Sequence, residues 1–129
     1  MLLLALTCAV AQGAPVAPPP PPPKAPVNDT FAATFRTGPA WDPAKAPQDQ
    51  AAFAAHSQNL RALRNEGRLL LGGRYGELGL VVLRAASLDE ARSFVERDPS
   101  VKAGTFAVDV QPFYPFMPGC VGQEKVAGR

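Results

Sequence analysis

Two stretches of the sequence decide the fold: FAAHSQNLRAL at residues 53–63, continued by EGRLLLGG at 66–73, and SLDEARSFVERDP at 87–99, continued by VKAG at 101–104. Apolar side chains recur in the first stretch at the spacing of an amphipathic helix, and His56, the one histidine of the chain, lies on the same stripe. The second stretch has the same periodicity behind a helix-start pattern. Each stretch therefore predicts a helix with one buried face.

The ends of both predicted helices are marked by residues with specific backbone roles. The first helix is expected over residues 48–65, with Gly67 at the position where a left-handed residue closes a helix. The second begins at Ser87, where Glu90 completes a capping box, and it ends at Pro99. The predicted buried faces of the two helices consist of Phe53, Leu60, Leu63, Leu88, Ala91, Phe94 and Val95.

Four short segments with strand patterns surround the helices. Residues 31–36 and 105–111 alternate apolar and polar side chains, whereas 69–71 and 78–83 are apolar runs, the former ended by a glycine pair. The order strand, helix, strand, strand, helix, strand is that of the ferredoxin-like α+β fold. We expect a βαββαβ domain whose four-stranded antiparallel sheet carries both helices on one face.

The segment at residues 78–83 is apolar on both of its alternating sides. A strand of this type is covered on both faces of its sheet, yet the two predicted helices cover only one face. A domain of this size also gains stability by burying more apolar surface. We therefore expect a second copy of the chain to cover the other face in a homodimer.

Outside the folded part the sequence divides into three segments. Residues 1–11 are apolar and end in the pattern Ala-Val-Ala of a signal-peptidase site, which predicts an export signal and a periplasmic or secreted protein. Residues 12–27 contain an unbroken proline run and predict a disordered spacer of polyproline II conformation. The folded domain is expected over 28–118 and a flexible tail over 119–129.

These outer segments have alternative interpretations. The first is either a signal or a disordered apolar N-terminus, and it is too short for a stable membrane span, which needs about 20 apolar residues. The proline run is either a spacer or a PxxP ligand for a partner domain. Cys8 would leave with a signal, so Cys120 would be a free thiol or half of an intermolecular disulfide.

Composition excludes several classes of function. The net charge is +2, with acidic and basic residues interspersed and no basic run, so nothing favours binding to nucleic acid. One histidine and two cysteines cannot form a His-rich or Cys-rich metal centre. No phosphate loop, dinucleotide fingerprint or Ser-His-Asp order is present. The sequence therefore predicts neither a metal nor a cofactor.

Several short features, in the same order along the chain, resemble the YCII-related family. They are the single histidine of the first helix, the GRLLLGG passage at 67–73, the SLDEA helix start at 87–91, the Asp-Pro and VKAG segment at 98–104, and the GPAW turn at 38–41. The resemblance implies a ferredoxin-like fold that dimerises into an α/β barrel. Relatives of this barrel shape include haem proteins, but no motif of this chain supports haem with the histidine as its axial ligand.

The resemblance also implies that His56 and Asp98 form the active-site pair proposed for the family. A carboxylate fixes the tautomer of an imidazole and makes it a general acid/base near neutral pH. The alternative for His56, whose position on the helix stripe points inward, is a satisfied core residue. The alternative for Asp98, which precedes Pro99, is a local turn-forming residue.

Arg36, Arg74 and Tyr75 are the candidates for substrate binding. A guanidinium at the end of a strand can hold an anionic group through its planar fork. The alternative is that these side chains belong to solvated strand ends.

Two hypotheses for function follow. The first is an exported small enzyme of lyase, isomerase or hydrolase type, which uses His56 with Asp98 for proton transfer on a small organic molecule. The second is a non-catalytic protein that binds a small molecule inside a dimeric barrel. The two differ in whether His56 faces a pocket that solvent can reach or is enclosed in the core.

Overall fold

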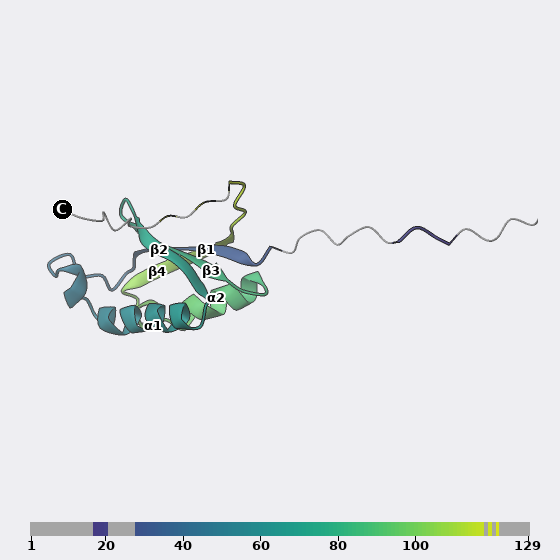
Figure 1. Cartoon of the computed structure of the whole chain (residues 1–129). Helices are drawn as coiled ribbons and strands as arrows, with labels where there is room; N and C mark the ends of the chain where they lie inside the picture. Colours follow the sequence, from purple (N-terminus) through teal and green to yellow (C-terminus); the bar gives the residue numbers. More distant parts are fainter. Residues whose placement is uncertain (1–16, 21–27, 118, 120, 122–129) are drawn as a thin grey trace, which may run out of the picture.

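The computed structural model describes residues 17–20, 28–117, 119 and 121 (Figure 1). Within these residues the elements are, in chain order, β1 (Thr30–Thr37), the 3-10 helix η1 (Pro47–Asp49), α1 (Phe53–Asn65), β2 (Leu69–Tyr75), β3 (Leu78–Arg84), α2 (Leu88–Glu96), α3 (Pro99–Lys102) and β4 (Phe106–Pro112). None of the helices in these ranges is long and apolar enough to cross a membrane. The export signal expected at 1–11 lies outside the described residues, as do most of the spacer and most of the tail, so these assignments stay predictions.

The strands form one antiparallel sheet in the order β2-β3-β1-β4. Helices α1 and α2 lie on the same face of this sheet (Figure 1). α1 runs along β2 and α2 along β4, and the short α3 packs against α1. This is the ferredoxin-like α+β fold that the order of elements predicted.

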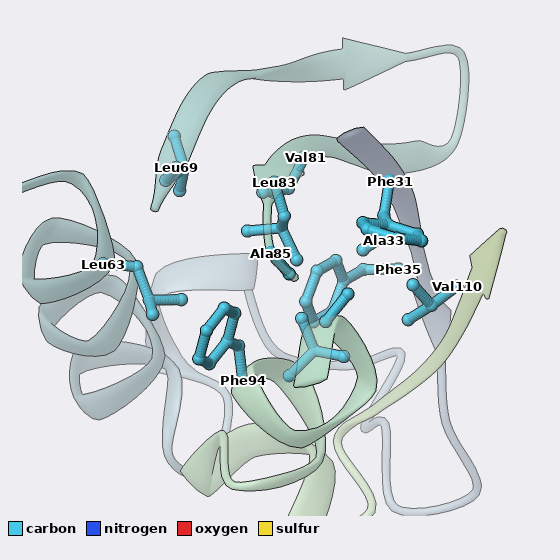
Figure 2. Packing of buried hydrophobic residues seen from close by; sticks show 12 residues of the cluster. Phe31, Ala33, Phe35, Leu63, Leu69, Val81, Leu83, Ala85, Phe94 and Val110 are labelled. Atoms are coloured by element: carbon cyan, nitrogen blue, oxygen red, sulfur yellow. The ribbon is translucent and has the colours of Figure 1, made fainter. Parts of the chain in front are cut away.

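The hydrophobic core lies between the sheet and the helices (Figure 2). Alternate residues of β1, namely Phe31, Ala33 and Phe35, face the helices and are at most 4% exposed. Phe94 and Val95 of α2 meet them from the other side. Full burial of a large apolar side chain stabilises the fold by about 1.5–3 kcal/mol. The same cluster includes Leu63, Leu69, Val81, Leu83, Ala85, Ala91 and Val110.

Helix α1 begins at Phe53, so the prediction that it starts at residue 48 was wrong. Residues Pro47–Asp49 form the single turn η1, and Ala52 has a left-handed backbone with φ of 62°. A left-handed residue cannot continue a right-handed helix. The chain therefore changes direction at Ala52 before α1 begins.

The C-terminal end of α1 was predicted correctly. Gly67 has a φ of 72°, its N–H bonds to the carbonyl of Arg64, and the N–H of Arg68 bonds to the carbonyl of Leu63. This pair of bonds is the Schellman motif, which satisfies the last carbonyls of a helix. The motif turns the chain directly into β2.

Strand β2 does not stop at Leu71, as the sequence predicted, but continues through Gly72 and Gly73 to Tyr75. Both glycines remain paired with β3, because glycine keeps the donor and acceptor that the ladder needs. The other strands differ from their predicted bounds by a single residue at either end. At this end of β2, the two glycines leave the backbone of the sheet uncovered by side chains of their own.

The connection from α2 to β4 contains a helix that the sequence did not predict. α2 begins as expected, with the Ser87 hydroxyl accepting from the Glu90 N–H at 3.1 Å. Pro99, however, starts the four-residue helix α3 instead of ending α2. Asp98 is the N-cap of α3, with its Oδ1 accepting from the Ser100 N–H at 2.9 Å. An Asp cap followed by Pro at the first helical position is a favoured helix start.

Candidate active site

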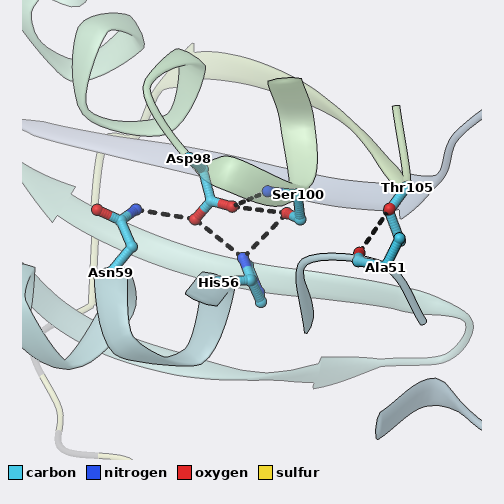
Figure 3. A network of polar contacts seen from close by, with 6 residues as sticks. All are labelled: Ala51, His56, Asn59, Asp98, Ser100 and Thr105. Carbon is cyan, nitrogen blue, oxygen red and sulfur yellow. Dashed lines mark hydrogen bonds and ion pairs between the residues drawn. The ribbon is translucent and has the colours of Figure 1, made fainter. Parts of the chain in front are cut away.

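The structure brings His56 and Asp98 together, although they are far apart in the sequence (Figure 3). The Nδ1 of His56 lies 2.9 Å from the Oδ2 of Asp98. α1 carries the histidine on its inward stripe, and the cap of α3 carries the carboxylate. Because α3 packs against α1, the capping geometry itself directs Asp98 toward the imidazole.

Every acceptor position of the Asp98 carboxylate is used. Oδ2 accepts from His56 Nδ1 and from Asn59 Nδ2, the latter at 2.8 Å. Oδ1 accepts from the backbone N–H of Ser100 at 2.9 Å and from its hydroxyl at 2.6 Å. A carboxylate offers about four such positions. The side chain is 0% exposed, and this full set of donors offsets the cost of burying its charge.

The network fixes the charge of Asp98 and the tautomer of His56. Burial on its own would raise the pKa of the Asp98 carboxyl, but the hydrogen bonds from His56, Ser100 and Asn59 outweigh burial and lower the pKa from 3.8 to about 2. Asp98 is therefore ionised at neutral pH and can only accept hydrogen bonds. His56 must then donate from Nδ1, which leaves the lone pair of the neutral ring on Nε2.

Ser100 completes a serine, histidine and carboxylate cluster, but its geometry is not that of a nucleophile. Its Oγ lies 3.3 Å from His56 Nδ1, the nitrogen that already carries a proton. Its own hydroxyl hydrogen is directed to Asp98, and the residue is 0% exposed. An activated serine needs the free lone pair of its base and access to the substrate. Ser100 instead holds Asp98 in place.

The Nε2 of His56 faces open space. It has no hydrogen-bond partner among the described residues, yet no buried side-chain nitrogen or oxygen there lacks a partner, so Nε2 must be accessible to solvent. The ring packs against Phe35 and Phe106, with centroids at 5.2 Å in both cases, and against Phe53 at 6.2 Å. His56, which is 9% exposed, is therefore both part of the core and part of a cavity wall.

His56 lines a cavity of about 420 Å³. It lies between the first turns of α1 and the end of the sheet, and the loop between β1 and α1 forms its outer side. Its volume is in the range of sites for small organic ligands. The residues that line it are Phe35, Arg36, Thr37, Trp41, Pro47, Phe53, His56, Leu60, Gly72, Gly73, Arg74, Glu77, Gly79, Leu80, Val81 and Phe106.

Arg74 lines this cavity from β2. It pairs with Gly79 of β3, which in turn pairs with Phe35 of β1. Paired residues of adjacent strands share a face of the sheet, and Phe35 faces the helices. The side chain of Arg74 therefore leaves the sheet on the cavity side.

The other two predicted binding residues are placed differently. Arg36 also lines the cavity, although strand alternation directs its Cβ to the opposite face from Phe35, so it belongs to the rim. Tyr75 pairs with Leu78 on the face opposite Arg74, is 72% exposed and is not part of the cavity lining. A binding role for Tyr75 stays a prediction.

Two residues of the polar network were missed in the sequence. Asn59 follows His56 by three positions, which is helical spacing, so the two side chains lie on neighbouring parts of one helix face. Ser100 follows Asp98 by two, as expected for the residue whose N–H an Asp cap accepts. Both signals are recognisable only once Asp98 is taken as a helix start.

The arrangement can move protons in a cavity beside the polar network. The described ranges contain no group of three His, Cys, Asp or Glu side chains that could hold a metal ion. The cavity instead offers one basic nitrogen of defined tautomer, two guanidinium groups and the Glu77 carboxylate on its rim, and mostly apolar walls. Such a site suits acid/base chemistry on a small, largely apolar molecule.

Residues 40–114 match the sequence model of the YCII-related domain. No curated protein matches the chain. Among solved structures, a 5-chloro-2-hydroxyhydroquinone dehydrochlorinase from Burkholderia phenoliruptrix AC1100, in complex with 2,5-dihydroxybenzoquinone, is 24% identical, with a TM-score of 0.44 over 65% of this chain and 93% of that chain. The matched domain contains His56, Asp98 and every other residue of the polar network.

Proposed function

The chain belongs to the YCII-related domain family, and we propose that it is a small enzyme in which His56 is the general acid/base and Asp98 its orienting partner. The observation that carries the proposal is the state of the two ring nitrogens. Nδ1 is held by a buried, ionised carboxylate at 2.9 Å, while Nε2 is unpaired within the described part and belongs to a ring that lines a cavity of about 420 Å³.

The proposed step is a proton transfer to Nε2. A substrate in the cavity gives up a proton from a C–H or O–H bond, and the electron pair of that bond stays on the substrate. Nε2 then returns the proton at another atom, or a leaving group departs with an electron pair, which gives an isomerase or a lyase. The imidazolium formed in between is stabilised by Asp98.

Hydrogen exchange with the solvent tests this function on a panel of small organic compounds. Keto acids, lactones and hydroxylated ring compounds are incubated with the protein in deuterium oxide, and C–H signals are followed by NMR. We expect faster exchange for at least one compound, saturating with its concentration. Trp41, the one tryptophan of the chain, lines the cavity, so its fluorescence reports binding independently.

The same experiment separates the alternative function. A protein that only binds a small molecule would change its Trp41 fluorescence on addition of a ligand and would exchange no hydrogen in any bound compound. That result would contradict the enzyme and support the non-catalytic protein. In both cases the ligand would occupy the cavity that His56 lines.

We further propose a homodimer that buries the sheet face opposite the helices. Val82 points to that face, because its neighbours Val81 and Leu83 belong to the core on the other side. The strand register assigns to this face a mostly small and apolar set, namely Ala32, Thr34, Leu71, Leu80, Val82, Ala107, Asp109 and Gln111. In the dimeric α/β barrel that the family resemblance implies, the same face of a second chain would cover this surface.

A charge in the middle of this face should split the dimer. We expect light scattering to give twice the monomer mass for the protein and the monomer mass for Thr34→Arg, which stays folded because Thr34 is partly exposed in one chain. Gln58→Arg, on the exposed side of α1, is the control and should remain a dimer. A wild-type protein that is monomeric at micromolar concentration would contradict the shared sheet face.

A further inference from the structure

The aromatic side chains in the cavity wall suit a flat ring. Trp41 and Phe53 approach Phe106 with centroid distances of 5.6 and 6.4 Å, and Phe35 approaches it at 6.3 Å. Aromatic rings attract one another in offset or edge-to-face arrangements. All four rings line the cavity, so a ligand ring entering it would find several such contacts at once.

The floor of the cavity is sheet backbone. Gly72, Gly73 and Gly79 line it; of these, Gly72 lies on the helix side of the sheet, and a Cβ added there would meet no atom closer than 3.9 Å. The first two continue β2 where a strand normally carries packing side chains. A flat ligand can therefore approach the peptide planes closely, in a space that a non-planar ring would fill poorly.

A charged side chain, that of Arg74, lies next to this floor. Arg74 shares the row of Gly79 on the cavity side and forms no ion pair within the residues that the structure describes. Arg36 on the rim is likewise without one in that range, whereas Glu77 contributes the opposing charge from the β2–β3 turn. Two cations against one carboxylate favour an anion over a cation in the cavity.

We infer that the cavity takes a single aromatic ring bearing an oxyanion, which Arg74 binds while the ring lies between the aromatic wall and the glycine floor. The inference rests on the proposed function, because it names the substrate class of the same site. The guanidinium fork matches the two oxygens of a ring carboxylate, and it can also hold the single oxygen of a phenolate. The charge anchors the ring so that one of its atoms faces His56.

Titration of Trp41 fluorescence with matched compounds tests the inference. Benzoate is compared with neutral benzamide of the same shape, with non-planar cyclohexanecarboxylate of the same charge, and with 4-cyanophenolate as the phenolate. We expect benzoate to bind at least about tenfold more tightly than benzamide and cyclohexanecarboxylate, since a charge-assisted bidentate pair contributes this much. The ratio of benzoate to 4-cyanophenolate then tells which oxyanion the site prefers.

Substitutions of charged residues show where the anionic group binds. Arg74→Gln should remove the advantage of benzoate over benzamide, whereas Glu77→Gln should increase the affinity for benzoate because it removes the one opposing charge. Arg84→Gln is the matched control, since Arg84 pairs with Asp29 and does not line the cavity, and it should bind as wild type does. Equal binding of benzoate and benzamide, or unchanged benzoate binding in Arg74→Gln, would overturn the inference.

The result of the benzoate binding test does not depend on whether the protein is catalytic. His56→Asn should still bind benzoate, since the anion is held at Arg74. If benzoate binds through Arg74 but no compound exchanges hydrogen, the enzyme fails and the ligand class holds. If neutral ketones exchange hydrogen and anionic rings do not bind, the enzyme holds and the ligand class fails.

Discussion

Replacing Asp98 with alanine should cost about 3–5 kcal/mol of the free energy of unfolding, because it removes a buried carboxylate on which four hydrogen bonds converge. The change deletes the N-cap of α3 and leaves His56, Asn59 and Ser100 without their shared acceptor. For a domain of this length the melting temperature should fall by roughly 15 °C or more. Asp89→Ala, at an exposed acidic residue of α2, should change it little.

The stability that Asp98 contributes should depend on pH in a defined direction. Its folded pKa of about 2 is below its ordinary value of 3.8, so the ionised group stabilises the folded state fully above pH 4. The shift corresponds to about 2 kcal/mol. This contribution should decline as the pH falls from 4 to 2 and be lost below it.

Asp98→Asn isolates the charge from the cap. Asparagine caps a helix as well as aspartate does, so this variant should fold and should lose only the pH-dependent part. Unfolding of wild type and Asp98→Asn, measured by circular dichroism at several pH values, should differ at pH 6 and converge near pH 2. An unchanged melting temperature for Asp98→Ala, or a constant difference between wild type and Asp98→Asn, would contradict the role given to the buried carboxylate.

The fold could be predicted because its signals are local. The helix stripes, the Ser87 start and the Gly67 stop each depend on a few consecutive residues, and their order leaves one common topology. The errors occurred where distant contacts decide the backbone. β2 crosses its glycine pair because β3 supplies the ladder partners, and α3 is too short to be stable without its tertiary contacts.

The site was predictable only in part, for the same reason. His56 stands out as the single histidine on an inward stripe, and the family resemblance supplied Asp98. Asn59 of α1 and Ser100 of α3 bond to the same carboxylate. No sequence pattern joins Asn59 to Asp98, because they are 39 positions apart. The face of the sheet that Arg74 occupies was not predictable either, because only the strand register through Gly79 shows it.

Replacing His56 with asparagine should strongly slow the proposed hydrogen exchange while preserving the fold. The Asn amide nitrogen stands where Nδ1 does, so it can still donate to Asp98, but the variant has no group in place of Nε2. We expect the hydrogen-exchange rate to fall by about 10²- to 10⁴-fold, which is the usual contribution of a general acid/base. Gln58→Asn, at the exposed surface of the same helix, should exchange as wild type does.

Chemical rescue makes the role of the ring specific. His56→Ala should leave a space continuous with the cavity of about 420 Å³, and added imidazole can enter it from solvent. We expect imidazole to restore part of the exchange activity of His56→Ala and to leave His56→Asn unchanged, because the asparagine still occupies the site. If His56 only packs against Phe35 and Phe106, both variants should lose stability and neither should lose exchange. A proton carrier, in contrast, can be supplied from outside once its space is free.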